Sequence, residues 1–422
     1  MSELVFVDDK IARRFEPFAL TRPVCELRAG ALLIRERWTQ SLGVKPAGFV
    51  SSRHLADFDE PAAARAVNGK IRKGTILVNA RCAISLAPAP AADVWTCGAK
   101  VAAITLPRDI DSSELDEAPL DALASKEGRR VEVQGWWMNH VWDFINHLAA
   151  MLSPDIASLG RPAHALKRED VLRAGSHDVF VEPGADVERQ VFFDCSAGPV
   201  LVRRGAHVQA FTRIVGPCVI GAESQVSGDK VATCSIGDVC KVHGEVSTSI
   251  FLGHANKGHD GFVGHSYLGR WVNLGAGTIT SNLKNNYGPV DFWTPDGEQD
   301  TGMQFLGTLF GDHAKIGIGT ALSTGTFVGA GANVYGAIMP PKMVPPFAWG
   351  DQPPYSTYRM DKFLETAKRM MSRRHVELSD RQAAMLMAAA AIATDGGQRR
   401  RTATADSDRG QERDAAARRR ST

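Results

Sequence analysis

The sequence predicts a small α/β domain, Rossmann-like, followed by a left-handed parallel β-helix. Three observations lead to this fold class. Strand-like and helix-like runs alternate through roughly the first 150 residues. Apolar residues then recur every six positions from about Val179 to Val334, and glycine often follows the apolar residue. We expect an α/β domain at 1–155, the β-helix at 175–345, carboxy-terminal helices at 356–393 and a disordered tail at 395–422.

The first domain begins with a buried-strand run, Leu4–Val7, and further strand-like runs stand at 75–78 and 101–104. A helical stretch opens near Gly30. From Trp136 onward, apolar residues follow the spacing of an amphipathic helix. These signals indicate a small α/β domain closed by a helix.

The six-residue period fits neither an isolated α-helix nor a sheet of hairpins, and it is typical of a hexapeptide β-helix. In each hexad the apolar residue points into a prism, and glycine turns the corner without a Cβ clash. The polar run 283–305 interrupts the period, so we expect a loop ejected from a corner, where binding faces often lie. The in-phase residues include Val208, Ile214, Ile220 and Val226, and later Phe310, Ile316, Leu322, Val328 and Val334.

Composition narrows the class of protein. Hydrophobic residues make up 44% and charged residues 23%, and 49 Lys+Arg against 47 Asp+Glu give a formal charge of +2. This balance predicts no nucleic-acid partner. The absence of a membrane-length apolar run or leader-like start predicts no membrane partner and a cytoplasmic location. Seven cysteines without a Cys-x-x-Cys motif indicate buried thiols rather than disulfides or zinc. From Asp395 the chain lacks large apolar residues, which predicts disorder.

The densest polar cluster covers residues 254–265 and 271–282. Acyl transfer from a thioester to an amine needs a base that titrates near neutral pH, which is the property of histidine. It also needs donors for the developing oxyanion, and backbone N–H groups at Gly275–Gly277 can supply them. Asn273 and Asn282 can hold sugar hydroxyls.

The string from Lys257-Gly258-His259 through Asn273-Leu274-Gly275-Ala276-Gly277-Thr278-Ile279-Thr280 to Asn282 resembles the acetyltransferase domain of GlmU. GlmU is the bifunctional enzyme family that makes UDP-N-acetylglucosamine. The resemblance covers roughly residues 205–340 and implies a homotrimeric transferase that uses acetyl-CoA and an amino-sugar 1-phosphate. It further implies that His259 is the general base, that Asn273 and Asn282 contact the amino sugar, that Ala276 contacts coenzyme A, and that Glu245 is the acidic residue upstream.

The sequence departs from this family at two places. Phe262 stands where the family has a tyrosine, and the arginine and lysine that hold the sugar phosphate align near Asp229 and on Ser247. Lys257 or Lys230 therefore remains as a candidate phosphate ligand. We include Glu245, Lys257 and Phe262 among the expected substrate contacts.

The first domain resembles the head of GlmU-related sugar nucleotidyltransferases, through Phe18-Ala-Leu20-Thr21-Arg22-Pro23-Val24, Glu26-Leu27-Arg28 and Ile34–Trp38. That group joins such a head to a hexapeptide β-helix. The resemblance implies UDP-sugar-forming nucleotidyl transfer, with Mg²⁺ and a nucleoside triphosphate as the accompanying ligands. The glycine-rich loop that usually cradles the nucleotide phosphates is absent.

Arg22 and Arg28 stand before the expected helix near Gly30, so two guanidinium groups and a helix N-terminus can hold a phosphate there. The alternative is that both arginines brace the loop against Asp8, Asp9 and Glu26. We expect this domain to bind a sugar phosphate or nucleotide through Arg22 and Arg28 but to transfer nucleotidyl groups weakly or not at all.

Two other functions stay open. His254 and His259 stand five residues apart, as in β-helix zinc enzymes of the carbonic anhydrase type. Catalytic zinc needs three protein ligands, however, and no spacing picks a third histidine, so we predict no metal ligands. Without the phosphate-binding cations, the chain can instead be a non-catalytic sugar-nucleotide sensor or scaffold.

Overall fold

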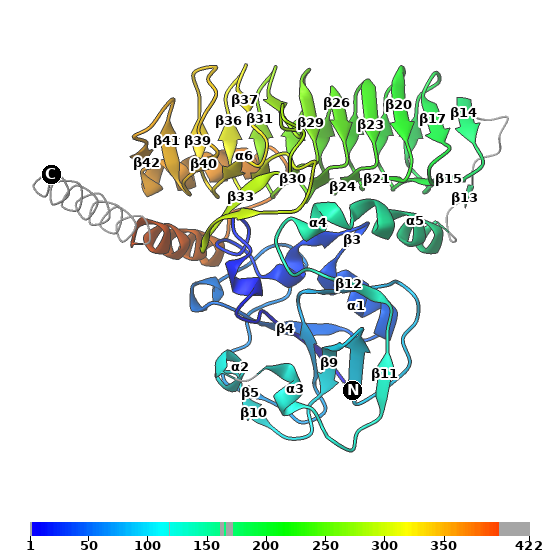
Figure 1. Cartoon of the computed structure of the whole chain (residues 1–422), viewed down its shortest axis with the longest axis vertical. Coiled ribbons are helices and arrows are strands. Elements are labelled where there is room, and N and C mark those ends of the chain that lie inside the picture. The colour runs from blue at the N-terminus through cyan, green and yellow to red at the C-terminus, as the bar shows by residue number, and fades with distance from the viewer. Residues whose placement is uncertain (1, 118, 161–163, 166–171, 396–422) are drawn as a thin grey trace, which may run out of the picture.

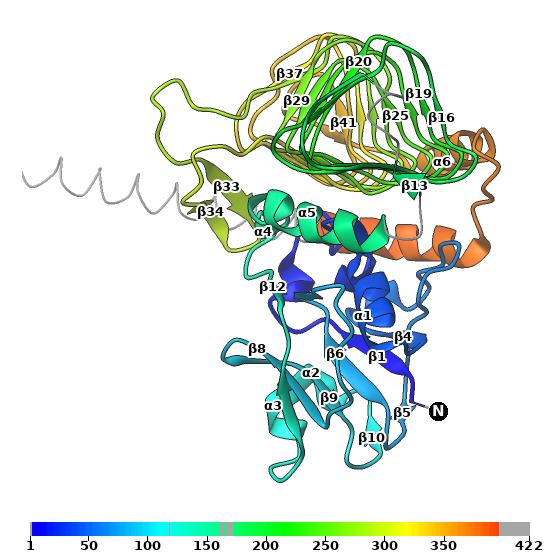
Figure 2. The same ribbon diagram turned by 90° about the vertical axis from the view of Figure 1, so that its right-hand side faces the viewer.

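The computed structural model describes residues 2–117, 119–160, 164–165 and 172–395. A β-helix forms one layer and the amino-terminal domain another, and helices α4 (Asp143–Asn146) and α5 (Leu148–Leu159) lie between them (Figures 1 and 2). The predicted fold class, an α/β domain followed by a left-handed β-helix, is confirmed. Among the described residues, no helix has the length and apolar character needed to cross a membrane.

The amino-terminal domain is built on a six-stranded sheet in the order β11-β8-β9-β6-β1-β4. The central strand β1 pairs in parallel with β4 and β6, whereas β9 is antiparallel to β6 and β8, so the sheet is mixed. Apolar clusters cover both faces, which explains the buried run at Leu4–Val7. The strands are β1 (Leu4–Val7), β4 (Pro46–Val50), β6 (Ile76–Asn79), β8 (Val94–Cys97), β9 (Lys100–Thr105) and β11 (Arg130–Glu132).

Two helix predictions in this domain were wrong in position. The helix expected near Gly30 is α1 (Ile34–Leu42), and residues 28–33 form the hairpin of β2 (Arg28–Ala29) and β3 (Leu32–Leu33). The helix expected from Trp136 starts later, because β12 (Gly135–Trp137) pairs with β7 (Cys82–Ile84). Adjacent tryptophans favour a pleated strand, and this sheet pairing outweighs the helical spacing. The remaining strands and α-helices of the described domain are β5 (Lys70–Ile71), β10 (Ile110–Asp111), α2 (Glu114–Glu117) and α3 (Leu120–Leu123).

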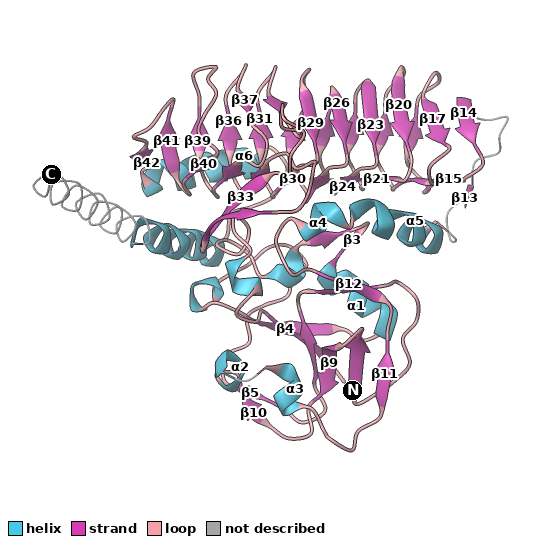
Figure 3. Ribbon diagram, viewed as in Figure 1, coloured by secondary structure: helices cyan, strands magenta, loops and turns pink. Residues whose placement is uncertain are grey.

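The β-helix has three faces whose strands pair in parallel, except that β13 and β42 pair antiparallel with β15 and β41 at the two ends. Figure 3 shows the strands stacked along its length. The first comprises β14 (Leu172–Gly175), β17 (Phe192–Cys195), β20 (Thr212–Val215), β23 (Asp229–Ala232), β26 (Glu245–Ser247) and β29 (Phe262–Gly264), followed by the pair β32 (Ile279–Thr280) and β37 (Ala321–Leu322). The second comprises β13 (His164–Ala165), β15 (Val179–Val181), β18 (Val200–Val202), β21 (Cys218–Ile220), β24 (Ser235–Ile236), β27 (Ile250–Phe251), β30 (Tyr267–Leu268), β35 (Leu309–Phe310), β38 (Phe327–Val328) and β40 (Met343–Val344).

The third face comprises β16 (Asp186–Val187), β19 (His207–Val208), β22 (Gln225–Val226), β25 (Lys241–Val242), β28 (Asn256–Lys257), β31 (Asn273–Leu274), β36 (Lys315–Ile316), β39 (Asn333–Val334), β41 (Ala348–Gly350) and β42 (Ser356–Thr357). We call the segments that lead from a third-face strand to the next first-face strand the third corner. They include 209–211, 227–228, 243–244, 258–261, 275–278 and 317–320.

The periodic apolar residues fill the prism as predicted, and both in-phase series are buried in one core cluster. Stacked turns approach so closely that some corners need glycine. A Cβ added at Gly221 would lie 2.4 Å from the carbonyl carbon of Gly237 in the next turn. The six-residue glycine pattern is thus a requirement of turn stacking.

The interrupting segment 283–305 is ejected as expected and forms the hairpin of β33 (Asp291–Thr294) and β34 (Gly297–Asp300). It reaches back to the amino-terminal domain, where Phe292 packs edge-on against Trp142 and Asp296 pairs with Arg14. The chain then leaves the prism into α6 (Met360–Ser372) and a helix at 380–395. The predicted disordered tail lies, apart from Asp395, outside the described residues.

The amino-terminal domain is fixed to the second face by an apolar cluster that contains residues of both, including Phe18, Val219 and Tyr267. Within it lies a buried ion network. Arg22 binds Glu60 at 2.8 Å and Asp312 at 2.8 Å, and Arg270 binds the other oxygen of Glu60 at 2.6 Å. Burial alone would raise the pKa of Glu60, but the two arginines outweigh it and lower that pKa to about 2.

We expect Arg22→Ala to destabilise the protein by about 3–5 kcal/mol, because two buried carboxylates lose their shared cation. Denaturant unfolding measures the effect. Arg14→Ala is the matched control, since Arg14 pairs with Asp296 at the surface and its loss should cost at most about 1 kcal/mol. Equal stability of the two variants would contradict the role of the network.

Candidate functional site

An open hollow of about 890 Å³ runs along the third corner. It is lined mainly by small residues of successive turns, so the corner is recessed there. His259 and Ala276, the expected base and coenzyme A contact, both line this hollow, together with His243, Asp260 and Ile318. The structure therefore brings together two residues that the sequence analysis assigned to one reaction.

His259 lies between β28 and β29 and is exposed. Its imidazole has no hydrogen-bond or ion-pair partner among the described residues. The acidic residue expected upstream, Glu245, instead pairs with Lys230 at 3.2 Å on the first face. The imidazole of His259 is thus free to meet a ligand, and no carboxylate of the described chain orients it.

Ala276 is exposed at the next turn of the third corner. The N–H groups of its neighbours are already used, because Gly275 donates to the carbonyl of Ile316 and Gly277 to that of Asp260. The N–H of Ala276 donates to no other described residue. Of the three backbone donors expected at 275–277, one is therefore available to an oxyanion in the hollow.

Lys257 is buried, and its ammonium is held by backbone carbonyls. It donates to His243 at 3.2 Å, to Asp260 at 3.0 Å and to His259. Burial lowers its pKa to about 8, partly offset by Asp260 and Asp229. All three N–H donors are occupied by the chain itself, so this arrangement offers no donor to a substrate phosphate.

The two asparagines lie apart. The side chain of Asn273 accepts a hydrogen bond from Asn256 at 2.8 Å on the third face. Asn282 instead contacts Nδ1 of His265 at 2.8 Å, next to Gly264 and Phe262 of the first face. The expected sugar contacts Asn282 and Phe262 thus both lie beside Gly264, and burial lowers the pKa of the neighbouring His265 to about 4.

No histidine triad for zinc is present in the described ranges. His254 is half-buried against Trp271, with ring centroids 4.2 Å apart, and burial lowers its pKa to about 4. The one group of three potential metal ligands in the described part of the chain is Asp229, His243 and Asp260, which excludes both His254 and His259. The sequence analysis missed this trio. Its members lie on successive turns of the prism, so only their shared position near the third corner could have indicated it.

Arg22, Arg28 and Gly30 are not arranged around an anion. Arg22 is enclosed in the ion network, and Arg28 donates to the carbonyl of Ala31. Gly30 lies in the β2–β3 turn, where a Cβ would come within 2.3 Å of Asp155. The bracing alternative fits this geometry, but for Arg22 the partners are Glu60 and Asp312 rather than Asp8, Asp9 or Glu26.

The carboxyl edge of the amino-terminal sheet gathers other polar groups. Asp8 and Asp9 follow β1, and Asn79 ends β6. Asp9 accepts hydrogen bonds from Arg81 at 2.7 Å and Asn79 at 3.0 Å. Asp8 accepts one from Ser51 at 2.6 Å, and burial raises its pKa to about 7. Mg²⁺ needs free carboxylate oxygens, and here both acids are already engaged, so these residues do not fit the ion.

A smaller cavity of about 200 Å³ lies at the same edge, beyond the end of β4. In parallel α/β sheets, ligands commonly bind outside the carboxyl ends of the strands. The exposed Arg53 is the cation in its lining. Its polar lining residues are Ser51, Ser52, Arg53, Asn68, Ser112, Ser113 and Asp116.

Comparison with known proteins supports the similarity. Residues 4–162 match the family model described as sugar nucleotidyl transferase. The chain is 29% identical over 168 residues to the bifunctional protein GlmU of Bartonella quintana, which covers 38% of this chain and 32% of that protein. It is 31% identical over 96 residues to the bifunctional sugar-1-phosphate nucleotidylyltransferase/acetyltransferase of Sulfurisphaera tokodaii, covering 22% and 24%.

The resemblance to GlmU and to sugar nucleotidyltransferases is therefore confirmed, at modest identity. The chain spans about a third or less of the length of these curated relatives.

Proposed function

We propose that this protein transfers an acetyl group from acetyl-CoA to the amine of an amino-sugar phosphate, in the third-corner hollow. The observation that carries the proposal is the shared lining of that hollow by His259 and Ala276. A free imidazole and an unused backbone N–H are the two groups that acyl transfer to an amine needs. The curated relatives include an acetyltransferase in name.

In the proposed reaction the amine nitrogen attacks the thioester carbonyl carbon, and His259 accepts the proton that the nitrogen loses. The N–H of Ala276 donates to the carbonyl oxygen while it carries negative charge. The carbon–sulfur bond then breaks, an amide remains on the sugar, and coenzyme A leaves as the thiol after it takes up a proton. Ala276 acts through its backbone, which explains why a residue without a functional side chain belongs to the site.

We expect His259→Ala to reduce the acetyl-transfer rate by ~10²–10⁴, the usual contribution of a general base. The measurement follows free thiol release with a panel of amino-sugar phosphates. His177→Ala is the matched control, because His177 is an exposed histidine near the first turn of the β-helix, distant along the chain from the hollow. If His259→Ala keeps the wild-type rate, His259 is not the general base. Binding of acetyl-CoA without any transfer would favour the sensor function.

We also propose a homotrimer in which the third corner lies at a subunit boundary. Large apolar side chains are exposed along this corner: Phe211 is 80% and Ile318 69% exposed, and Met339, beyond β39, is 69% exposed. A recessed hollow beside such side chains is a surface that a second subunit can cover. The orienting partner that His259 lacks within the described chain can then come from the neighbouring subunit.

Light scattering at micromolar concentration should give three times the 45.5 kDa chain mass. Ile318→Glu places a charge in this boundary and should shift the mass toward the monomer, whereas the exposed Ile11→Glu should not. A monomeric wild-type protein would rule out the trimer.

For the amino-terminal domain, we propose that it binds a sugar phosphate or nucleotide at the carboxyl edge of its sheet, with slow nucleotidyl transfer. The match of residues 4–162 supports the ligand class, and the 200 Å³ cavity beside Arg53 supports the place. Nucleotidyl transfer also needs a metal that bridges the phosphates. Asp8 and Asp9 are engaged by the chain, so we expect turnover well below that of an efficient enzyme.

Pyrophosphate release with UTP or dTTP and several sugar 1-phosphates measures the turnover, and calorimetry measures binding. Arg53→Ala should weaken binding at least tenfold, whereas Arg72→Ala, an exposed arginine outside the cavity, should not. Equal affinity in the two variants would place the ligand elsewhere. Fast turnover would overturn the claim of slow transfer.

A further inference from the structure

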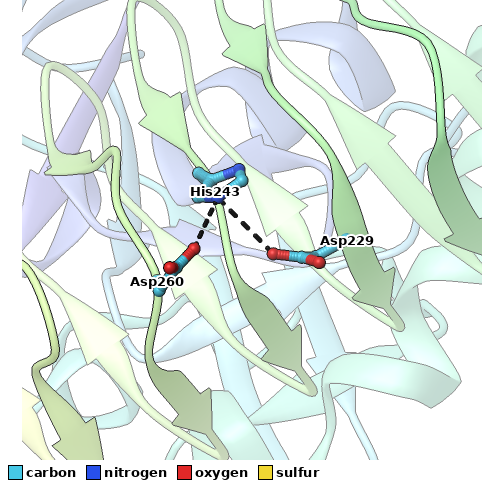
Figure 4. Close-up of side chains that lie close together, drawn as sticks. All are labelled: Asp229, His243 and Asp260. Atoms are coloured by element: carbon cyan, nitrogen blue, oxygen red, sulfur yellow. Dashed lines mark hydrogen bonds and ion pairs between the residues drawn. The ribbon is translucent and has the colours of Figure 1, made fainter.

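Asp229, His243 and Asp260 converge on one point beside the hollow, although they come from three successive turns of the β-helix (Figure 4). Nε2 of His243 lies 2.7 Å from Oδ1 of Asp260 and 3.5 Å from Oδ2 of Asp229. One ligand atom from each residue lies within 4.8 Å of the other two. We propose that this trio is a binding site for a divalent transition-metal cation such as Zn²⁺ or Mn²⁺.

The first argument is the direction of the imidazole. Nδ1 of His243 is hydrogen-bonded to the backbone carbonyl of Ser227. A carbonyl oxygen can only accept, so Nδ1 carries a proton, and Nε2 is the ring atom that faces the two carboxylates. A histidine that ligates a metal is oriented in this way, with its other ring N–H donated to a backbone carbonyl or a carboxylate.

The second argument is charge. Two carboxylate groups that face one another across Nε2 of His243 favour a positive charge between them. Neither Asp229 nor Asp260 forms an ion pair with a lysine or arginine of the described residues. The nearby cations are engaged elsewhere: Arg213 binds Asp194, Lys230 binds Glu245, and the ammonium of Lys257 faces backbone carbonyls. A bound cation balances the two carboxylate charges.

The third argument is size. Zinc–ligand bonds of about 2.0–2.2 Å place the donors of a tetrahedral ion roughly 3.4 Å apart. The separations of 2.7 and 3.5 Å bracket that value. The side chain of Asp260 is 88% exposed and can rotate by the small amount required. Three protein donors also leave one position open to water or to a phosphate oxygen.

A comparable group elsewhere on the β-helix lacks these features and provides the control. Nε2 of His207 lies 2.8 Å from Glu188 and 3.4 Å from Asp186, nearly the same distances. These three side chains do not form a convergent group, since the trio at His243 is the only such group in the described ranges. No backbone carbonyl of the described chain fixes the ring of His207 through its other nitrogen.

The test uses the full chain, stripped with a chelator and then dialysed against Zn²⁺, Mn²⁺ or Co²⁺, with metal content measured by mass spectrometry. We expect one ion per chain, and cobalt absorption bands that report nitrogen and oxygen ligands. His243→Ala and Asp260→Asn should weaken binding by at least ~100-fold, the upper end of the effect of losing a supporting partner. His207→Ala should bind as the wild type does.

Asp260→Asn keeps the test valid if His243→Ala fails to fold, because Asp260 is exposed and circular dichroism can verify the variant. Absence of a stoichiometric ion in the wild-type protein would overturn the proposal, and so would equal losses in the His207 and His243 variants. The readout is metal content rather than acetyl transfer, so its outcome is independent of the proposed enzymatic function.

Discussion

The buried contact between Arg22, Glu60, Asp312 and Arg270 determines how the two halves of this protein are joined. The amino-terminal domain and the β-helix each contribute one carboxylate and one guanidinium group. Removal of either domain's charges would leave buried charges of the other without their partners. The phenol of Tyr267 adds to this link, because it accepts from the N–H of Arg28 at 2.7 Å and donates to its carbonyl at 3.1 Å. The second face of the β-helix is therefore used for the contact between the two domains.

The position of this interface limits where the β-helix can form a ligand site. With the second face covered by the amino-terminal domain, the corner between the third and first faces is left free, and it holds the hollow with His259 and Ala276. In the other half, the carboxyl edge of the six-stranded sheet is the counterpart, with the cavity beside Arg53. The two candidate sites thus lie on different parts of the molecule.

Two buried lysines donate hydrogen bonds to backbone carbonyl groups at the corners of the β-helix. Lys257 and Lys315 both extend from third-face strands and donate to backbone carbonyls, Lys315 to Trp271 at 2.9 Å and to His313 at 2.8 Å. Most of these carbonyl groups accept no other hydrogen bond in the described chain, although that of Asp260 also accepts from the N–H of Gly277. Burial lowers the pKa of Lys315 to about 7. The position of Lys257 between Asn256 and Gly258 therefore does not by itself make it a substrate ligand.

The sequence by itself determined the β-helix, because a six-residue apolar period with glycine after it is a local repeat that each turn obeys independently. The resemblance to GlmU also predicted that His259 and Ala276 act together, and both line one hollow. The tertiary structure alone decided the fate of Arg22, which looked like an anion ligand until Glu60 and Asp312 closed around it. It alone separated Asn282 from His259 and gathered Asp229, His243 and Asp260, because packing between distant segments fixes which way a side chain points and what neutralises its charge.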